Sequence, residues 1–285
     1  MPNSILKKNP TLIIVTTLAL FEIVLYFLTK NKTLLNQFQI FGINIHFYGI
    51  LIAISVLIAY LISRSEVKRR NLDIDFFDSL ILFAIIGGVI GARIAFLLFS
   101  NNQYDNFADL LNISNGGLSI HGAVIGGIIA VAIYGFIKYK KIIEYLSISM
   151  PQILLAQAIG RWGNYFNKEI VGKPSNSFLA MQVPSSDVPA QYFGYQTFLP
   201  VFLFESLILV AAYIIYLILK AQNDKINGIK YYLISYGVIR FLVEFFRSDY
   251  QPIVIGLDFA QIASILMIVF AIIIFNNTNL DKSAK

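Results

Sequence analysis

Eight long apolar stretches constrain the fold of this chain more than any other feature of its sequence. They lie at 11–29, 43–63, 76–99, 118–137, 146–160, 200–219, 229–246 and 256–275. A membrane-spanning helix needs about 20 such residues, and the one short stretch, 146–160, can extend into the polar residues that follow it. Because 57% of the 285 residues are hydrophobic and only 13% are charged, whereas soluble domains carry about 25% charged residues, the sequence predicts an all-α polytopic membrane protein.

The Lys and Arg residues predict how these helices are oriented. Of the 22 cations, fourteen fall on one side of the predicted membrane, in the loops at 64–71, 138–141 and 220–230 and in both tails, and six fall on the other. Cytoplasmic loops collect Lys and Arg. We therefore expect both termini inside and residues 161–199 outside, as a proline-containing irregular cap. This topology accounts for the net charge of +6, and no nucleic-acid partner is expected.

Few side chains of this sequence could act as nucleophiles, titrate near neutral pH or bind a metal. The chain has no cysteine and only two histidines, His46 and His121. Disulfides and cysteine nucleophiles are therefore excluded, and any thiol must come from a partner. With so few ligands we expect no metal site, and the sequence shows no sign of an organic cofactor.

Ionisable groups inside spanning segments are costly and usually functional. The first polar group is "IHFYGI" at 45–50, which places His46 and Tyr48 near the outer end of a predicted helix. Both residue types are common at the membrane–water interface, and the interface alone explains this segment.

The second polar group lies in two glycine-rich segments, "GGVIGARIAF" at 87–96 and "GGLSIHGAVIGG" at 116–127. Glycines four residues apart let helix backbones approach closely, which is our reading of the glycines. Arg93 has a simple explanation that needs no function, because an arginine near a helix end can extend its guanidinium group to water. His121 is harder to explain as packing, and its imidazole could take or give a proton.

The third polar group is "YGVIRFLVEFFRSD" at 236–249. Tyr236, Arg240 and Glu244 are spaced four residues apart, with Arg247 three further on, so they share one helical face. An Arg240–Glu244 pair that neutralises itself is one explanation. It does not explain why the membrane holds the pair at all, and the face predicts a polar cavity.

The segment "GRWGNYFNKEIVG" ends the short apolar stretch. Arg161, Asn164 and Asn167 are three apart and share a face if the helix continues, and Glu169 and Gly172 follow as the chain turns.

Arg161 and Arg240 thus present two guanidinium groups from different helices near the outer leaflet. Guanidinium groups match phosphate oxygens in a bidentate way. From the residues alone, the predicted ligand is the phosphate of an anionic lipid.

These segments, in their order and spacing, resemble the bacterial prolipoprotein diacylglyceryl transferase family over about residues 43–275. The resemblance implies a core of seven transmembrane helices with an outward-facing head, in the bacterial cell membrane. It implies transfer of the diacylglyceryl group of phosphatidylglycerol to the lipobox cysteine thiol of a prolipoprotein, the first step of lipoprotein maturation, with release of glycerol phosphate. The partners would be phosphatidylglycerol, the prolipoprotein signal peptide and membrane lipid.

The resemblance also implies roles for particular residues. Arg161 would bind the phosphate, and Arg240 would share that work or orient the leaving group. The candidate catalytic residues are His121, Tyr236, Arg240 and Glu244. The candidate substrate-binding residues are Arg161, Asn164, Asn167, Glu169, Gly172, Tyr48, His46, Arg93 and Arg247. His121 is the candidate base for the thiol, with His46 and Tyr236 as alternatives.

The chain departs from the family pattern in places. Leu199 stands where a histidine is usual and Phe204 where a tyrosine is usual, whereas Glu205 is retained. The stretch at 11–29 is additional to the seven-helix core. It is longer than the apolar part of a cleaved signal peptide, so we expect an uncleaved helix.

The expected organisation is therefore an extra span and connector at 1–42, a transferase core at 43–275 with its head at 161–199, and a cytoplasmic tail at 276–285. Two other functions remain as alternatives. A transporter or channel would need a polar path through the membrane and broken helices in matching halves, which the sequence does not suggest. The second alternative is an intramembrane protease or other phospholipid transferase, and a protease would need a Ser–His, Asp–Asp or HExxH set, none of which is convincing here.

Overall fold

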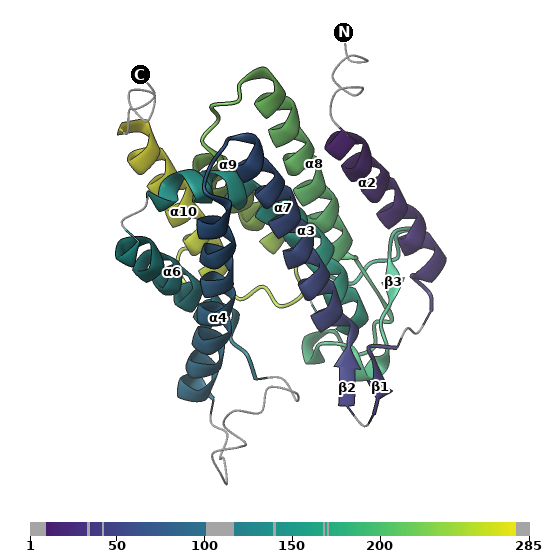
Figure 1. Ribbon diagram of the computed structural model, residues 1–285. Coiled ribbons are helices and arrows are strands. Elements are labelled where there is room, and N and C mark those ends of the chain that lie inside the picture. The colour runs from purple at the N-terminus through teal and green to yellow at the C-terminus, as the bar shows by residue number, and fades with distance from the viewer. Residues whose placement is uncertain are drawn as a thin grey trace. The chain divides into compact units, whose positions relative to one another are not determined.

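The computed structural model describes residues 10–32, 35–41, 43–100, 117–138, 141–167, 169 and 171–277. The N-terminal lysine pair and the predicted tail from residue 278 onward lie outside these residues. The described part contains eight α-helices, one in each predicted apolar stretch (Figure 1). They are α2 (Pro10–Thr29), α3 (Phe47–Arg69), α4 (Ile74–Phe99), α6 (Ile120–Ile137), α7 (Ile142–Asn167), α8 (Val201–Gln222), α9 (Gly228–Glu244) and α10 (Phe259–Asn277).

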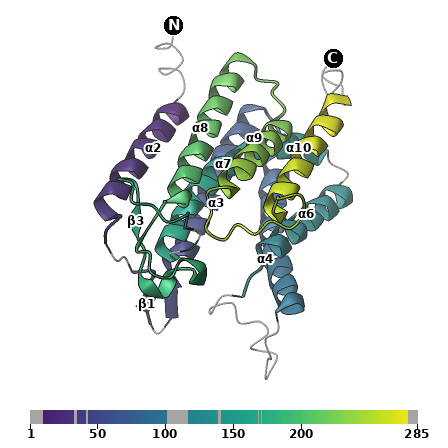
Figure 2. The same ribbon diagram turned by 180° about the vertical axis from the view of Figure 1, so that it is seen from behind.

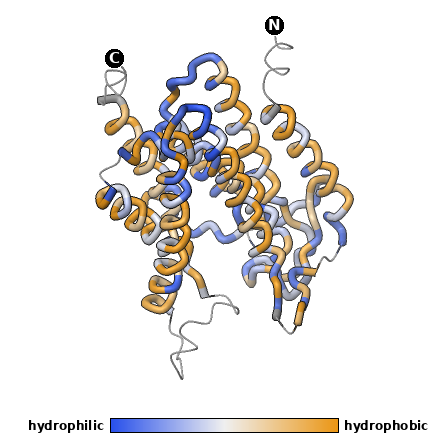
Figure 3. The backbone as a smooth tube through the Cα atoms, in the orientation of Figure 1, coloured by the Kyte–Doolittle hydropathy of each residue, from blue (hydrophilic) through white to orange (hydrophobic). Residues whose placement is uncertain are grey.

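Six of these helices, α2, α3, α4, α6, α7 and α8, are long and apolar enough to cross a membrane, and α10 contains a shorter apolar helix. Hydrophobic residues run along the helices, while hydrophilic residues gather in turns such as the one between α3 and α4 (Figure 3). The prediction of an all-α polytopic membrane protein is confirmed at this level.

Side-chain caps explain where several helices begin. Asp73 accepts a hydrogen bond from the Phe76 N–H at the start of α4, and Asn227 accepts one from the Lys230 N–H at the start of α9, both at 3.0 Å. Ser119 caps α6 in the same way. Such caps satisfy N–H groups that have no partner within the helix.

The prediction that the second stretch is helical from residue 43 is wrong. Residues Ile43–His46 form strand β2, which pairs with β1 (Gln37–Ile40), and α3 begins only at Phe47. Isoleucines alternate with polar residues in "INIH", a pattern that suits a half-exposed strand. His46 therefore ends a strand and does not lie in a helix.

The chain divides into two compact units. Unit 1 comprises 1–38, 45–59 and 149–285, and unit 2 comprises 39–44 and 60–148. Each is described by itself below.

Unit 2 is built on the pairing of α4 with α6, and the predicted close approach at the glycines is confirmed. A Cβ on Gly91 would collide with the Gly122 carbonyl, and one on Gly126 with the Gly87 carbonyl. Next to this contact a hydrophobic cluster fills the unit. It contains Val67, Phe76, Phe77, Leu80, Val131, Tyr134, Tyr145 and Ile148.

Unit 1 has an aromatic core in which α2, α7 and α8 meet. Tyr165 of α7 stacks on Phe202 of α8 with ring centroids 4.9 Å apart, and Tyr26 of α2 and Trp162 of α7 pack against the same ring. Both views of the ribbon show α2 beside α8, with strand β3 (Met181–Gln182) near the end of α2 (Figures 1 and 2).

The chain between α7 and α8 is irregular, apart from a short hairpin of β3 (Met181–Gln182) with β4 (Thr197–Phe198) and two 3₁₀ turns, Ser185–Asp187 and Ala190–Tyr192. We call residues 171–199 the head. The irregular part begins only after α7 ends at Asn167, so Arg161 belongs to the helix and not to the head.

Candidate active site

The centre of the candidate site is an ion pair between two helices of unit 1. Arg161 Nη2 on α7 lies 2.7 Å from Glu205 Oε1 on α8, and the Glu205 side chain is fully buried. Within the described part of the chain, neither Glu205 oxygen nor Arg161 Nε makes a directed hydrogen bond. The two groups are thus paired by distance but retain hydrogen-bonding capacity. Buried polar atoms are nearly always satisfied in folded proteins, so the Nε–H of Arg161 is the donor of this pair that an acceptor on a ligand could satisfy.

A second charged cluster lies at the end of α9. Arg240 Nη2 lies 2.6 Å from Glu244 Oε2, and Arg247 Nε lies 3.2 Å from Glu244 Oε1. The self-neutralising Arg240–Glu244 pair that the sequence offered as an alternative is therefore present. This pair is not isolated, because Glu244 also forms an ion pair with Arg247 and contacts the side chain of Asp258.

Arg247 connects the two clusters. It forms a two-point pair with Asp249, at 2.6 and 2.8 Å. Burial works to lower the pKa of Arg247, but the hydrogen bond to Asp249 raises it. The charges of Glu244, Asp249 and Glu205 add to that rise. The carboxylate that pairs with Arg161 thus acts on Arg247 through its charge, and we refer to the two clusters together as the charged network.

The backbone around Gly172 fixes Arg247 in place. Gly172 and Arg247 form an antiparallel bridge, and the Gly172 N–H donates to the Leu199 carbonyl at 2.9 Å. A Cβ on Gly172 would lie 2.7 Å from Val201 Cγ2 and 2.8 Å from the Leu199 carbonyl oxygen. Only glycine fits so close a backbone approach. Gly172 is thus a structural residue, and Leu199 contributes a backbone acceptor that does not depend on its side chain.

Asn164, Asn167 and Glu169 come together at the end of α7. The Asn164 amide donates to Glu169 Oε2 at 3.5 Å, the Asn167 amide donates to Glu169 Oε1 at 3.3 Å, and the Glu169 N–H donates to the Asn164 carbonyl at 2.9 Å. The helix continues to Asn167, as the three-residue spacing predicts. These side chains close the helix and carry the chain into the head.

Tyr236 lies one turn from Arg240 and stacks on Tyr232, with ring centroids 5.7 Å apart. The Tyr232 hydroxyl accepts a hydrogen bond from Gln157 of α7 at 3.1 Å, and the charge of Arg161 acts on Tyr232. The polar face of α9 therefore faces the helix that carries Arg161.

Tyr48 has a packing role within unit 1. Its ring occupies the space that a Cβ on Gly163 would need, so Gly163 lets Tyr48 lie against α7. His46, two residues earlier, is exposed.

Arg93 and His121 lie in unit 2. Arg93 is buried, donates to the Gly117 carbonyl at 3.0 Å and lies over the Phe96 ring, so it does not extend to water as the simple alternative had it. The Ser119 N–H donates to the Ala92 carbonyl at 3.0 Å. These bonds hold the turn that leads into α6, where His121 is exposed as the second residue.

Sequence reasoning left three buried carboxylates of unit 1 out of the candidate site: Glu205, Asp258 and Glu22. A carboxylate within an apolar run, as in "VFLFESLILV" and "LALFEIVLY", is itself a signal for a functional or paired group. Asp258 gives a weaker signal, because it also caps α10 through the Gln261 N–H at 2.8 Å.

Comparison of the sequence with known proteins finds relatives in one family. The family model for prolipoprotein diacylglyceryl transferase matches residues 36–276. The chain is 34% identical over 239 residues to phosphatidylglycerol–prolipoprotein diacylglyceryl transferase 1 of Clostridium perfringens, covering 83% of this chain and 91% of that protein. It is 35% identical over 241 residues to the phosphatidylglycerol–prolipoprotein diacylglyceryl transferase of Bacillus velezensis, covering 83% and 89%. A relative of the same name in Finegoldia magna is 34% identical over 241 residues, covering 83% and 92%.

Proposed function

The chain belongs to the prolipoprotein diacylglyceryl transferase family, and from this premise we propose that it transfers the diacylglyceryl group of phosphatidylglycerol to the lipobox cysteine of a prolipoprotein. This is the first step of lipoprotein maturation. The observation that carries the proposal is the Arg161–Glu205 pair, buried between α7 and α8 within the matched range and with hydrogen-bonding capacity unused.

The reaction is a displacement at the glycerol carbon that bears the phosphate. The lipobox thiol loses its proton, because the thiolate is the nucleophile. A sulfur–carbon bond forms as the carbon–oxygen bond to phosphate breaks, and the bonding electrons leave with glycerol phosphate. The proton passes to a base, for which we propose His121, with His46 and Tyr236 as alternatives.

Arg161 and Arg240 serve the phosphate in this scheme. Charge accumulates on the phosphate oxygens as the bond breaks, and oriented donors in a dry site stabilise such charge most effectively. Glu205 and Glu244 hold the two guanidinium groups in place at 2.7 and 2.6 Å. Arg247, which both carboxylates influence, adds a third positive charge to the network.

The remaining candidate residues position the segments around the proposed reaction site. Asn164, Asn167 and Glu169 join α7 to the head, where the glycerol hydroxyls or the peptide would bind. Arg93 holds the turn that carries His121. Tyr236 extends the polar face of α9 toward Arg161 through Tyr232.

We further propose that α3 to α10 belong to a seven-helix core with α2 as an additional span. The distribution of Lys and Arg supports a cytoplasmic location for both termini and an outward-facing head, in the bacterial cell membrane.

Mass spectrometry of a lipobox peptide tests the function directly. Purified protein incubated with the peptide and phosphatidylglycerol should increase the peptide mass by one diacylglyceryl group. A peptide with serine in place of cysteine should gain nothing, because it offers no thiol. No mass gain for the cysteine peptide, together with solute flux through protein-containing liposomes, would instead support a transporter.

A further inference from the structure

Helix α2 lies outside the matched family range, which begins at residue 36. It nevertheless belongs to the same compact unit as the charged network and contributes Tyr26, with no exposed surface, to the aromatic core. The helix is therefore an integral part of unit 1 and needs an explanation beyond anchoring.

The unusual residue of α2 is Glu22. It lies in the middle of the apolar helix and is 3% exposed. The Ser206 hydroxyl on α8 donates to Glu22 Oε2 at 2.9 Å, and the buried indole of Trp162 on α7 lies near the carboxyl without a hydrogen bond to it. The second oxygen, Oε1, has no hydrogen-bond partner among the described residues. A carboxyl is costly inside a spanning helix, and such residues usually have a function.

The residues that surround Glu22 are the chain neighbours of the Arg161–Glu205 pair. Ser206 follows Glu205 in α8, and Trp162 follows Arg161 in α7. The Ser206 oxygen also lies 2.8 Å from the Ala158 carbonyl of α7. One hydroxyl group thus links α2, α8 and α7 at the residue next to Glu205.

The end of α2 is bound to the head. The Tyr26 hydroxyl donates to the Leu179 carbonyl, and the Lys30 ammonium donates to the Phe178 carbonyl. These bonds restrict rotation and sliding of α2, so Glu22 is held at a fixed depth.

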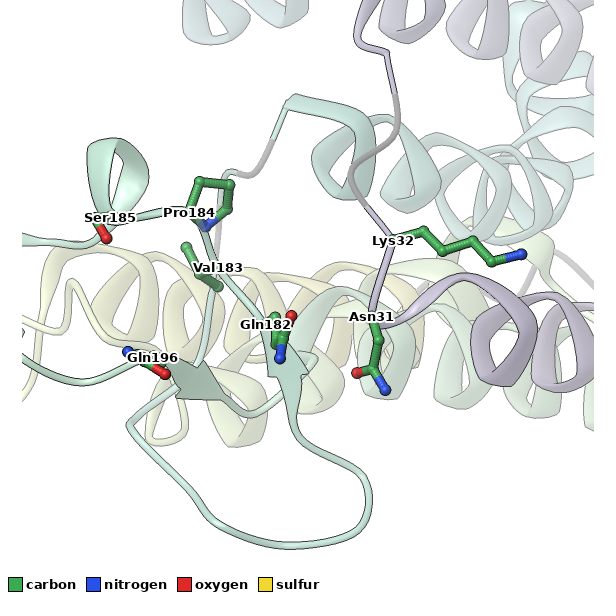
Figure 4. A pocket seen from close by; sticks show the side chains of 7 residues that line it. All are labelled: Asn31, Lys32, Gln182, Val183, Pro184, Ser185 and Gln196. Atoms are coloured by element: carbon green, nitrogen blue, oxygen red, sulfur yellow. The ribbon is translucent and has the colours of Figure 1, made fainter.

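A small polar pocket of about 250 Å³ marks the same junction. Its walls are Asn31 and Lys32, just after α2, and the β3–β4 hairpin with the residues that follow β3 (Figure 4). On the other side, the Tyr165 hydroxyl of α7 donates to the Thr29 carbonyl at 2.7 Å. The C-terminal half of α2 is therefore fixed against α7, α8 and the head.

We propose that Glu22 is a positioning residue of the transferase. By accepting the Ser206 hydrogen bond, it fixes the rotation of α8 so that Glu205 holds the Arg161 guanidinium toward the lipid phosphate. This role rests on the proposed function of Arg161. It gives the additional helix a part in phosphatidylglycerol recognition.

Kinetics with variants of Glu22 test the inference. Glu22→Ala should lower kcat/KM for phosphatidylglycerol about tenfold per folded enzyme, because the Ser206 hydroxyl loses its acceptor on α2 and can donate only to the Ala158 carbonyl of α7. It should leave KM for the lipobox peptide unchanged. Glu22→Gln should recover most of the loss, because its amide oxygen still accepts from Ser206. Thr17→Ala is the matched control, since Thr17 is an exposed polar residue of α2 that bonds only within its own helix, to the Ile13 carbonyl.

The effect of Glu22 should pass through Arg161. In an Arg161→Lys background, Glu22→Ala should cause little further loss. Losses that multiply would overturn the inference, as would a Glu22→Ala protein that melts earlier but keeps full kcat/KM per folded molecule.

The only tryptophan provides a readout that does not depend on turnover. Trp162 lies beside Arg161 and near the Glu22 carboxyl, so its fluorescence should respond when phosphatidylglycerol is titrated into the detergent-solubilised protein. Glu22→Ala should weaken the apparent affinity about tenfold, while Glu22→Gln and Thr17→Ala retain it. An unchanged titration in Glu22→Ala would contradict the positioning role. Absence of peptide modification by the wild-type protein would contradict the proposed function, whatever the titration shows.

Discussion

Arg161 of α7 and Glu205 of α8 meet at 2.7 Å, and the carboxylate is fully buried although neither of its oxygens makes a directed hydrogen bond within the described chain. Such a pair contributes little net stability by itself, but removing one partner leaves an uncompensated charge. Only the Arg161 side of the pair can engage an anionic group, through its Nε–H, which has no partner among the described residues.

Glu205→Leu should destabilise the protein strongly because it leaves Arg161 buried and unpaired. The expected loss is about 3–5 kcal/mol, measured as a fall in melting temperature in detergent. Asp78→Asn is the control, because the Arg64–Asp78 pair is 42% and 31% exposed and should cost under about 1 kcal/mol. Equal, small effects of both changes would contradict the buried ion pair.

Gly172→Ala should destabilise the junction of the head with Arg247. Its new methyl group would lie 2.7 Å from Val201 Cγ2 and 2.8 Å from a Leu199 backbone oxygen, and overpacking of this kind costs about 1–3 kcal/mol. Gly49→Ala is the matched control, since a Cβ at Gly49 meets nothing within 4 Å and alanine has a higher helix propensity than glycine. Thermal unfolding should show a loss for Gly172→Ala and no loss for Gly49→Ala, and the reverse order would exclude the close backbone approach.

The Arg247–Asp249 ion pair should make a pH-dependent contribution to stability just after α9. The hydrogen bond from Arg247 holds the pKa of Asp249 below its ordinary value. A depressed carboxyl pKa stabilises the fold above the unfolded pKa of about 3.9, and the contribution is lost as the pH falls through the lower, folded-state pKa. Asp249→Asn should therefore lower the melting temperature slightly at pH 6 and have no effect at very low pH. Because the side chain is 55% exposed, the loss at pH 6 should stay below about 1 kcal/mol, and a difference independent of pH would argue against the ion pair.

The topology can be measured with a single cysteine, since the chain has none. Ser186 is exposed in the head, and Ser186→Cys should react with a membrane-impermeant maleimide in intact cells whose outer envelope admits the reagent. A cysteine that reacts only after lysis would place the head on the cytoplasmic side.

The helices and part of the site could be predicted because their signals are local. Apolar length gives the spans, and the three-residue spacing of Arg161, Asn164 and Asn167 correctly predicts that α7 continues into polar sequence. The glycine spacing correctly predicts that helix backbones approach closely at these residues, although it does not predict that α4 packs on α6. These patterns depend on residues that are neighbours on a single helix.

Contacts between helices could not be predicted in this way. Spacing shows that Arg240 and Glu244 share a face, but nothing local shows that Arg161 pairs with Glu205 or that Ser206 binds Glu22, because each pair joins different helices. The strand at Ile43–His46 was missed because its isoleucines also suit an apolar helix, and short apolar runs are ambiguous between the two.

We propose that Arg161 and Arg240 bind one lipid phosphate. A double-mutant cycle on phosphatidylglycerol transfer tests this shared site most directly. Arg161→Lys keeps the charge but loses the planar donor pair, whereas Arg161→Ala loses both. The kcat/KM for phosphatidylglycerol should therefore fall in Arg161→Lys and fall further in Arg161→Ala, by roughly ten- to a hundredfold in the latter. Because residues that share a ligand are not independent, the Arg161→Ala/Arg240→Ala protein should lose less than the product of the single losses. Strictly multiplicative losses, with unchanged phosphatidylglycerol binding in Arg161→Ala, would contradict the shared phosphate site.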